Sequence, residues 1–248
     1  MDSLNMVHIS DFHLCADATR RVAGELPYPN FVQVIEHIAD SDLAVDLLLI
    51  GGDVAHDGAV ETYRKAHKLV SSLDAPFAVV AGNHDAADAM HSVLLANPLT
   101  CRDLLRGIGW DLHLVETQVE GEEDGEIPDS VVTSLGETCR QSEFSNHLLL
   151  MHHDIAQDPP GVRPGVVKPQ RFWRELLSLD RRVVVLTGHR HMASGVTLGN
   201  VSVLGTPSTC VQFVSGKDDV ERDPATKPGY RRVLLNSDGE FETQLCWP

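Results

Sequence analysis

The sequence predicts an α/β fold, and two observations lead to this class. Short apolar runs of strand length alternate with segments that have the 3.6-residue periodicity of amphipathic helices. Several of the apolar runs also end directly in Asp, Asn or His, and open α/β sheets hold their sites at the carboxyl ends of their strands. The 248 residues show no internal repeat, low-complexity tract or linker, so we expect a single domain over 1–248.

The composition limits both the core and the partners. Hydrophobic residues make up 42% of the chain but aromatic residues only 5%, so Leu, Val, Ile and Ala must fill the core. The net charge of −16 argues against a general nucleic-acid or membrane-surface binder. The same charge would repel an anionic substrate unless cations were bound locally, and the 13 histidines indicate where such cations could bind.

The N-terminal segment and the cysteines favour a cytoplasmic protein. The first residues have neither a basic segment nor a long apolar one, so we expect no signal peptide. No apolar run approaches the ~18–20 residues that span a bilayer. The five cysteines are scattered and contain no Cys-x-x-Cys pair, which favours reduced thiols over a disulfide framework or a thiolate zinc site.

The first part of the chain predicts three strands and three helices. We expect strands over 6–10, 46–51 and 77–81, and helices over about 31–40, 59–73 and 86–96. Asn30 is the expected cap of the first helix. The polar residues that follow the strands are Asp11 and His13, then Asp53, then Asn83, His84 and Asp85.

The second part predicts further strands around one helix. The expected strands are 110–115, 130–135, 147–151 and 182–187, with short β segments near 195–198, 201–205, 210–215 and 231–236 and a helix over about 170–179. The acidic stretch 120–126 is expected to be a solvated turn rather than a metal site, and the proline-rich stretch 159–169 an ordered loop near the site. The strand-end residues here are His152 and His153, then His189, Arg190 and His191.

Five strand ends therefore present seven candidate metal ligands. Their donors are oxygen or imidazole nitrogen and never sulfur, which suits first-row metals such as Mn, Fe, Co or Zn. The number of ligands suits a pair of ions. We expect Asp11, His13 and His191 to hold one ion, Asn83, His152 and His189 the other, and Asp53 to bridge them.

A pair of metal ions predicts phosphoryl transfer. Ions ~3.5–4 Å apart lower the pKa of a bridging water, neutralise the phosphoryl oxygens and align an in-line attack. Two divalent ions would also bring about +4 of charge to the place where an anion must bind, which answers the problem set by the acidic chain.

The order of these motifs resembles the calcineurin-like metallophosphoesterases. Asp-x-His, Gly-Asp, Gly-Asn-His-Asp, a strand-end His and Gly-His-x-His follow one another over residues 6–191. The tail is similar to that of bacterial class III cyclic-AMP phosphodiesterases, with Gly-Thr-Pro-Ser-Thr-Cys-Val-Gln-Phe at 205–213 and Pro-Gly-Tyr-Arg at 228–231. The Gly-Asp-Val-Ala-x-Asp-Gly run at 52–58 is similar as well.

The resemblance implies both a fold and an activity. The fold would be a four-layer α/β/β/α sandwich of two mixed β-sheets flanked by helices, with a C-terminal β extension over about 205–248. The activity would be hydrolysis of 3′,5′-cyclic AMP to 5′-AMP by in-line attack of a metal-bridging hydroxide, with iron and manganese the first metals to test. His84 would touch the phosphate and assist the leaving oxygen, and we expect Asp85 to orient it. The partner would be a small cyclic nucleotide rather than a nucleic acid or membrane, and a homodimer stays open.

Departures from the family pattern leave the substrate open. The His-His-Pro-Pro common after the fourth strand is His152-His153-Asp154-Ile155 here, and Phe12 occupies the middle of the first motif. The alternatives are other phosphodiesters, such as glycerophosphodiesters or 2′,3′-cyclic nucleotides, and a non-catalytic scaffold on the same fold. The seven intact ligands argue against the scaffold.

Several residues have expectations that do not involve metal binding. His56 stands where glutamine is common, and we expect a surface polar role for it rather than substrate contact. We expect His153 to support its neighbour His152 and Arg190 to be a charge at the surface or substrate edge. Residues 206–213 are open to three interpretations: β core, nucleotide-pocket lining or subunit contact. The remaining histidines are expected to be structural: His8, His37, His67, His91, His113 and His147.

Overall fold

The first sheet has the strand order β10-β9-β1-β2-β3. Its bounds are β1 (Ser3–Ile9), β2 (Leu47–Ile50), β3 (Phe77–Val79), β9 (Tyr230–Asn236) and β10 (Phe241–Cys246). β1, β2 and β3 are parallel, whereas β9 runs antiparallel to β1 and β10 antiparallel to β9. The carboxyl ends of the three parallel strands therefore meet at one edge.

The second sheet has the order β4-β5-β6-β8-β7. Its bounds are β4 (Trp110–Leu114), β5 (Asn146–Leu150), β6 (Arg182–Thr187), β7 (Ser194–Leu198) and β8 (Val201–Gly205). β4, β5, β6 and β8 are parallel and β7 is antiparallel to β8. The parallel strands β5, β6 and β8 are buried on both faces, as expected for parallel sheets covered by helices, whereas the antiparallel edge strand β7 is largely exposed.

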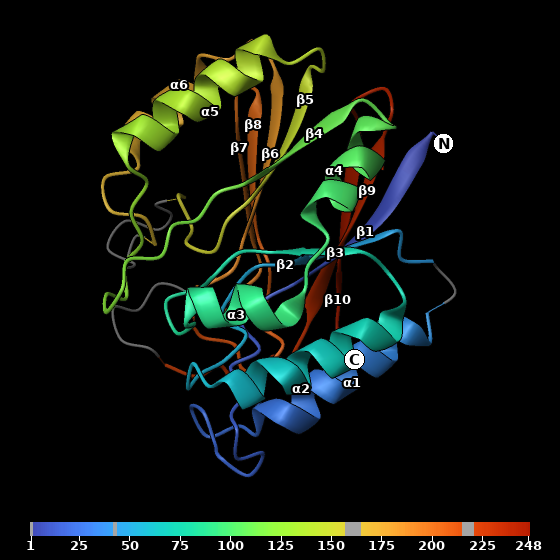
Figure 1. The fold of residues 1–248 in the computed structure, drawn as a ribbon, viewed down its shortest axis with the longest axis vertical. Helices are drawn as coiled ribbons and strands as arrows, with labels where there is room; N and C mark the ends of the chain where they lie inside the picture. The colour runs from blue at the N-terminus through green and yellow to red at the C-terminus, as the bar shows by residue number, and fades with distance from the viewer. Residues whose placement is uncertain (1, 42–43, 157–164, 215–220) are drawn as a thin grey trace.

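Helices cover the outer face of each sheet, which gives four layers (Figure 1). The first sheet carries α1 (Pro27–Ala39), α2 (Val60–Val70), the 3₁₀ turn η1 (Ser71–Leu73) and α3 (Ala87–Leu94). The second carries α5 (Asp129–Gln141) and α6 (Gln170–Leu177). The predicted α/β/β/α sandwich of two mixed sheets is thus confirmed.

The two sheets pack face to face through an apolar core. In β2 the side chains of Leu48 and Ile50 pack against the helices, whereas Leu47 and Leu49 pack against the other sheet. This alternation follows from the two-residue period of a strand. One end of the inter-sheet core is closed by α4 (Pro98–Arg106), whose buried side chains Cys101 and Leu105 join it.

The structure, a computed structural model, describes residues 2–41, 44–156, 165–214 and 221–248. Several expectations are wrong within these ranges. The predicted strand 130–135 is part of α5, because its buried residues recur at helical spacing (Val132, Leu135, Gly136 and Cys139). Residues 210–214 form no strand beyond an isolated bridge at Phe213. The first helix begins at Pro27, with Leu26 rather than Asn30 at its N-cap. Both α4 and β10 were not predicted. The expected loop 159–169 lies mostly outside the described residues.

Among the described residues, no helix combines the length and the apolar character that crossing a bilayer requires.

Candidate metal centre

The polar residues that follow β1, β2, β3, β5 and β6 meet at one end of the sandwich. Backbone hydrogen bonds join the loops within each sheet: the N–H of Asp11 donates to Gly52 O (3.0 Å) and that of Gly188 to His152 O (3.0 Å). Between the sheets, the N–H of His189 donates to both carboxylate oxygens of Asp11 (3.0 and 3.1 Å). The predicted convergence of distant strand ends is therefore present.

Three of the predicted ligands form a first group on the β1 side. His13 Nε2 lies 2.9 Å from His191 Nε2, and His191 Nε2 lies 3.5 Å from Asp11 Oδ1. All three side chains are buried. Their donor atoms lie close enough together to share one cation.

Three more predicted ligands form a second group beside the first. The side-chain oxygen of Asn83 lies 3.2 Å from His152 Nε2 and 3.1 Å from His189 Nδ1. An amide oxygen and two imidazole nitrogens that face one another at this spacing suit a first-row metal ion.

Asp53 lies between the two groups. Its Oδ2 atom is 3.5 Å from His13 Nε2 in the first group and 3.5 Å from His152 Nε2 in the second. Its Oδ1 atom accepts a hydrogen bond from the N–H of His84 (2.9 Å), which fixes the carboxylate. A carboxylate in this position can reach a cation on either side.

Backbone carbonyls orient two of the imidazoles. His152 Nδ1 lies 2.6 Å from Gly51 O, and His191 Nδ1 lies 2.8 Å from Val211 O. Each contact places the proton on Nδ1 and leaves the lone pair of Nε2 facing the group. This is the arrangement that metal-binding histidines usually adopt.

The backbone at these strand ends is strained. Nine non-glycine residues among those described have a positive φ, and five of them are predicted ligands: Asp11 (56°), His13 (47°), Asp53 (49°), His189 (67°) and His191 (50°). Left-handed conformations of this kind cost about 1–3 kcal/mol each and concentrate at functional sites. Gly52, with a φ of 91°, and Gly82, where a Cβ atom would collide with Asp53, allow the turns to form.

Burial and neighbouring charges shift the pKa values of the group. Burial disfavours the charged forms of Asp53 and His152, but the two attract each other, so the pKa of Asp53 falls well below its usual range and that of His152 rises to about 9. Burial also lowers the pKa values of His13 and His189, which keeps both imidazoles neutral. Burial raises the pKa of Asp11. Cations that bound here would displace a proton from His152.

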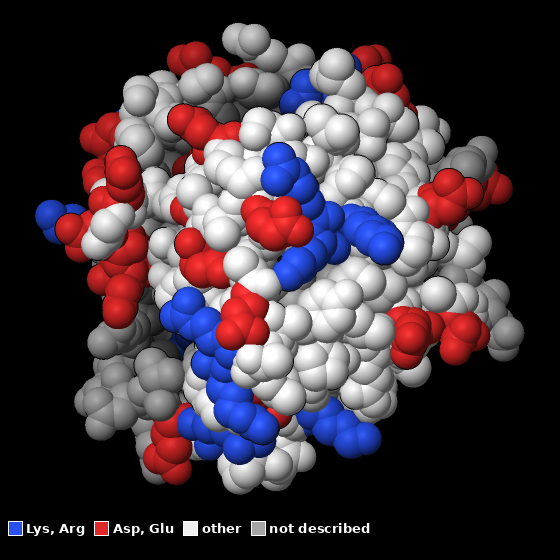
Figure 2. Space-filling model, turned by 60° about the horizontal axis from the view of Figure 1, so that its bottom comes forward, with Lys and Arg blue, Asp and Glu red and all other residues white. Residues whose placement is uncertain are grey.

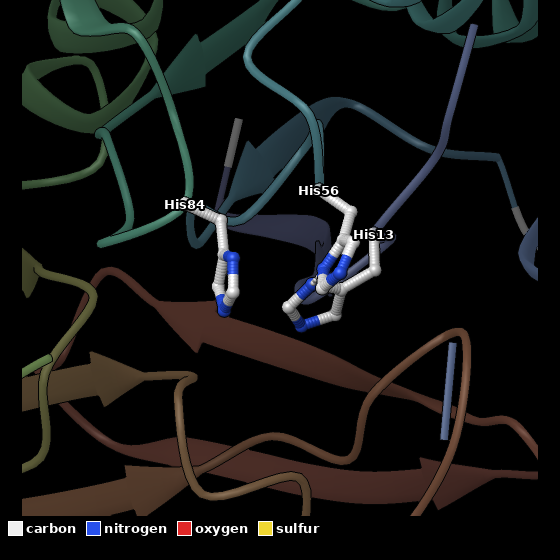
Figure 3. A group of neighbouring side chains, drawn as sticks. All are labelled: His13, His56 and His84. Carbon is white, nitrogen blue, oxygen red and sulfur yellow. Dashed lines mark hydrogen bonds between the residues drawn. The ribbon is translucent and has the colours of Figure 1, made fainter. Parts of the chain in front are cut away.

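Two further imidazoles from two other loops, those of His56 and His84, lie beside His13 of the first group (Figure 3). The ring of His84 is exposed, stacks on that of His56 at 4.7 Å and meets that of His13 edge-on at 4.9 Å. His56 Nδ1 also lies 3.3 Å from His13 Nδ1. The expected surface role of His56 is therefore wrong, because its half-buried ring supports His13 and packs on His84.

Asp85 does not orient His84, which corrects the role predicted for it. Within the described part of the chain, its carboxylate accepts hydrogen bonds from three N–H groups and a tyrosine hydroxyl, and none from His84. The donors are Gly82 N (3.0 Å), Val54 N (3.2 Å), Ala55 N (3.0 Å) and Tyr63 Oη (3.2 Å). Asp85 thus joins the β2 loop to the β3 loop.

Two further strand-end residues are buried. Arg190 forms an ion pair with Asp154 (3.2 Å) and donates to Ala156 O, so it is not the surface charge that we expected. His153 Nδ1 lies 2.7 Å from Thr117 Oγ1, and the other side of its ring faces His189 at 4.6 Å between ring centres. Its position agrees with the expected supporting role, although its nitrogen also lies near those of His152 and His189.

Residues 206–212 are buried behind the first group, with Phe213 half-buried. Ser208 Oγ donates to Asp11 O (2.8 Å), and the ring of Phe213 stacks on that of His191 at 4.4 Å. The segment is thus neither a regular strand nor an exposed surface; it supports two of the predicted ligands. Tyr63 and Thr117, which hold Asp85 and His153, had no signal in the sequence because both lie outside the strand-end motifs.

Charge is mixed on the face shown in Figure 2. Lysine and arginine side chains gather there in two groups, with acidic side chains among them and around the rim. Basic and acidic side chains are thus interspersed on this face.

Comparisons with known proteins agree with this geometry. A family model described as calcineurin-like phosphoesterase matches residues 4–216. The chain is 31% identical over 254 residues to a protein of Pseudomonas aeruginosa named 3′,5′-cyclic adenosine monophosphate phosphodiesterase CpdA, with 98% of this chain and 89% of the relative covered. A protein of the same name from Vibrio vulnificus is 28% identical over 247 residues, with 98% and 90% covered.

A solved structure shares the fold. The crystal structure of a dimetal phosphatase from Danio rerio superposes with a TM-score of 0.65 at 13% identity, covering 98% of this chain and 99% of that one. At this identity the likeness concerns the fold alone.

Proposed function

The chain belongs to the calcineurin-like phosphoesterase family and is a metal-dependent phosphodiesterase, and we propose from this premise that it hydrolyses 3′,5′-cyclic AMP to 5′-AMP. The observation that carries the metal-dependent chemistry in this proposal is the position of Asp53, whose Oδ2 atom is 3.5 Å from an imidazole of each ligand group. Such a carboxylate suits two cations held side by side.

The residues present fit a pair of metal ions. We assign Asp11, His13 and His191 to one ion and Asn83, His152 and His189 to the other, with Asp53 shared. Each ion then has four oxygen or nitrogen donors and room for water or substrate, as catalytic metal sites require. Burying these imidazoles and straining the backbone both cost free energy. Binding of cations would offset this cost. We propose iron or manganese first, with zinc and cobalt as alternatives.

When bound, the two cations would supply a water of lowered pKa and would offset the charge on the phosphoryl oxygens. The chain's own groups would position the ester. His84 is exposed at the rim of the site and its backbone is tied to Asp53, so its imidazole can reach an ester oxygen and donate a proton to it. His56 stacks on His84 and would limit the orientations of that ring.

The choice of cyclic AMP rests on the relatives rather than on the geometry. Both named relatives are 3′,5′-cyclic-AMP phosphodiesterases, and they align over nearly the whole chain. The same metal groups would serve glycerophosphodiesters or 2′,3′-cyclic nucleotides. The residues that follow His153 depart from the family pattern, and they are where a different substrate preference would arise.

A turnover panel tests the proposal. Purified protein would be loaded with Mn, Fe, Co or Zn and offered cyclic AMP, cyclic GMP, 2′,3′-cyclic AMP, a glycerophosphodiester and a bis-aryl phosphate. We expect the highest kcat/KM for 3′,5′-cyclic AMP with at least one metal and 5′-AMP as the product. A higher kcat/KM for another diester would replace the substrate, and no turnover with any metal would favour the scaffold.

We also propose that residues 1–248 form one domain in the cytoplasm. β9 and β10 lie in the extension over about 205–248; β9 pairs with β1 and β10 pairs with β9, so the extension is an integral part of the first sheet. The five cysteines are unpaired, as a reducing compartment would leave them.

A further inference from the structure

We infer that His113, Cys139 and His147 form a second metal site, for one zinc-like cation, on the outer face of the second sheet. His113 lies in β4, His147 in β5 and Cys139 in α5, which packs over these strands. The ligand atoms of the three side chains lie within 4.8 Å of one another. This site is independent of the proposed phosphodiesterase chemistry.

The strand register and the helix together bring the three side chains to one place. β4 and β5 pair in parallel, with Asp111 opposite His147 and His113 opposite Leu149, so both imidazoles lie on the same face of the sheet. Cys139 is four residues after Leu135 in α5 and shares its buried face, which packs on this side of the sheet. His147 precedes His152 by five residues along an extended chain, or about 17 Å, so the cluster is separate from the candidate metal centre.

The distances suit a tetrahedral zinc site. His113 Nε2 lies 3.1 Å from His147 Nδ1, and Cys139 Sγ lies 3.8 Å from His113 Nε2. With Zn–N of ~2.0–2.1 Å and Zn–S of ~2.3 Å, tetrahedral ligands are separated by about 3.3 Å for two nitrogens and about 3.6 Å for nitrogen and sulfur. Small side-chain movements would therefore admit the ion.

The two imidazoles are ready to bind a cation here, whereas the thiol must first lose its proton. Burial lowers the pKa values of His113 and His147 to about 4, so both imidazoles are neutral and have a lone pair available near pH 7. Burial raises the pKa of Cys139 to about 11, so its proton would leave for solvent as the sulfur–metal bond forms. The charge of Asp111 favours positive charge at both imidazoles, whereas Arg102, Arg106 and Arg181 oppose it.

The described chain supplies three ligands, so a water would complete the site. The Asp111 carboxylate is occupied by Arg106 Nε (2.8 Å) and by the hydroxyl of Ser142. His113 is only partly buried, which leaves a route for the ion. His147 Nε2 is buried and has no hydrogen-bond partner among the described residues, so the ring's only polar contact is with the cluster. One sulfur and two nitrogen donors with an open position suit zinc better than magnesium or calcium.

The experiment uses cobalt as a spectroscopic substitute for zinc in the whole 248-residue chain. The candidate metal centre has no sulfur ligand, so a thiolate-to-cobalt charge-transfer band in the near ultraviolet would report the second site alone. We expect wild-type protein to show this band and to bind one more equivalent of metal than Cys139→Ser or His113→Gln. Both variants should lose the band and keep their kcat within about twofold, since they lie far from the metal centre.

Two cysteine variants are the controls. Cys101→Ala removes a buried cysteine from the inter-sheet core, and Cys15→Ala removes the thiol that contacts His13 O (3.7 Å). Both should keep the band and the additional equivalent. If wild-type protein shows no band and the same metal content as Cys139→Ser, the three side chains form only a hydrogen-bonded cluster and the inference is wrong. Because His113 is partly exposed, His113→Gln still gives this test if Cys139→Ser does not fold.

Discussion

Two histidine clusters differ in the backbone that presents them. The cluster at the strand ends uses loops in which five candidate ligands have a positive φ, whereas His113, Cys139 and His147 lie in regular strands and a helix. A strained backbone is retained only where the surrounding structure and function compensate for it. Regular elements can bring metal-binding side chains together without this cost.

The difference concerns what each cluster requires of the fold. Loops that turn at φ values near 50° can direct side chains from both sheets to one point. The proposed bridging role of Asp53 requires this convergence, because the residue must face both ligand groups. Adjacent strands and one covering helix can collect only the few side chains that share a face. Strain therefore accompanies the cluster for which we propose catalysis, whereas the cluster of His113, Cys139 and His147 forms without it.

The largest effect is expected from Asp53→Ala, which removes the carboxylate that lies between the two groups and that we propose both cations share. Each metal ion contributes several kcal/mol of transition-state stabilisation, so losing the pair should reduce kcat by more than about 10⁴-fold. Metal analysis and steady-state kinetics measure both consequences. The matched variant Cys139→Ser should keep full activity. If the Asp53→Ala protein had wild-type metal content and turnover, the strand-end cluster would not be the catalytic one and the comparison between the two clusters would be wrong.

His84→Ala should separate proton donation from metal binding. His84 contacts the first group through its ring but is not one of the seven ligands assigned here, so metal content should stay at the wild-type level. Loss of a general acid typically reduces kcat by about 10²–10⁴-fold. A diester with a good leaving group needs less protonation and should lose less. Equal losses on all substrates would assign His84 to binding instead.

The sequence predicted the strand-end cluster because its signals are local. A buried apolar run followed by Gly-Asp or Asn-His shows where a parallel strand ends, and parallel strand ends meet at one edge. The role of Asp85 was not predictable, since its partners Val54, Ala55 and Tyr63 come from other elements. The cluster of His113, Cys139 and His147 had no signal in the sequence, because only the strand register brings His113 close to His147.

The same reasoning explains where the secondary structure predicted from the sequence was wrong. The Val131-Val132 pair in α5 has high β propensity, but packing of its helical face against the sheet overrides that preference. β10 has a half-exposed edge sequence with little periodicity, and it forms because β9 offers a partner. Both outcomes depend on contacts that are distant in the sequence.

Asp85→Ala tests whether hydrogen bonds within the loops maintain the strained strand ends. Three N–H groups and one hydroxyl would lose their acceptor, and each buried unsatisfied group costs about 1–3 kcal/mol, so we expect at least about 3 kcal/mol of lost stability in chemical denaturation. Asp85→Asn keeps one acceptor oxygen and should lose less. If Asp85→Ala is as stable as wild type but has a reduced kcat, the catalytic role first predicted for Asp85 is restored.

The smallest expected effect is on the pH dependence of stability, and it comes from His8 in β1 of the first sheet. Burial and the nearby Arg231 lower the pKa of His8 to about 3, while the unfolded chain has a pKa near 6.5. Between these values the unfolded state binds more protons, so stability rises with pH and falls by about 1.4 kcal/mol per unit as pH decreases below 6.5. In metal-free protein, His8→Gln should reduce this slope by that amount in denaturation curves between pH 6.5 and 4.5. An unchanged slope would mean that His8 is already charged in the folded protein, and that a regular strand can bury a charged imidazole as readily as the strand ends do.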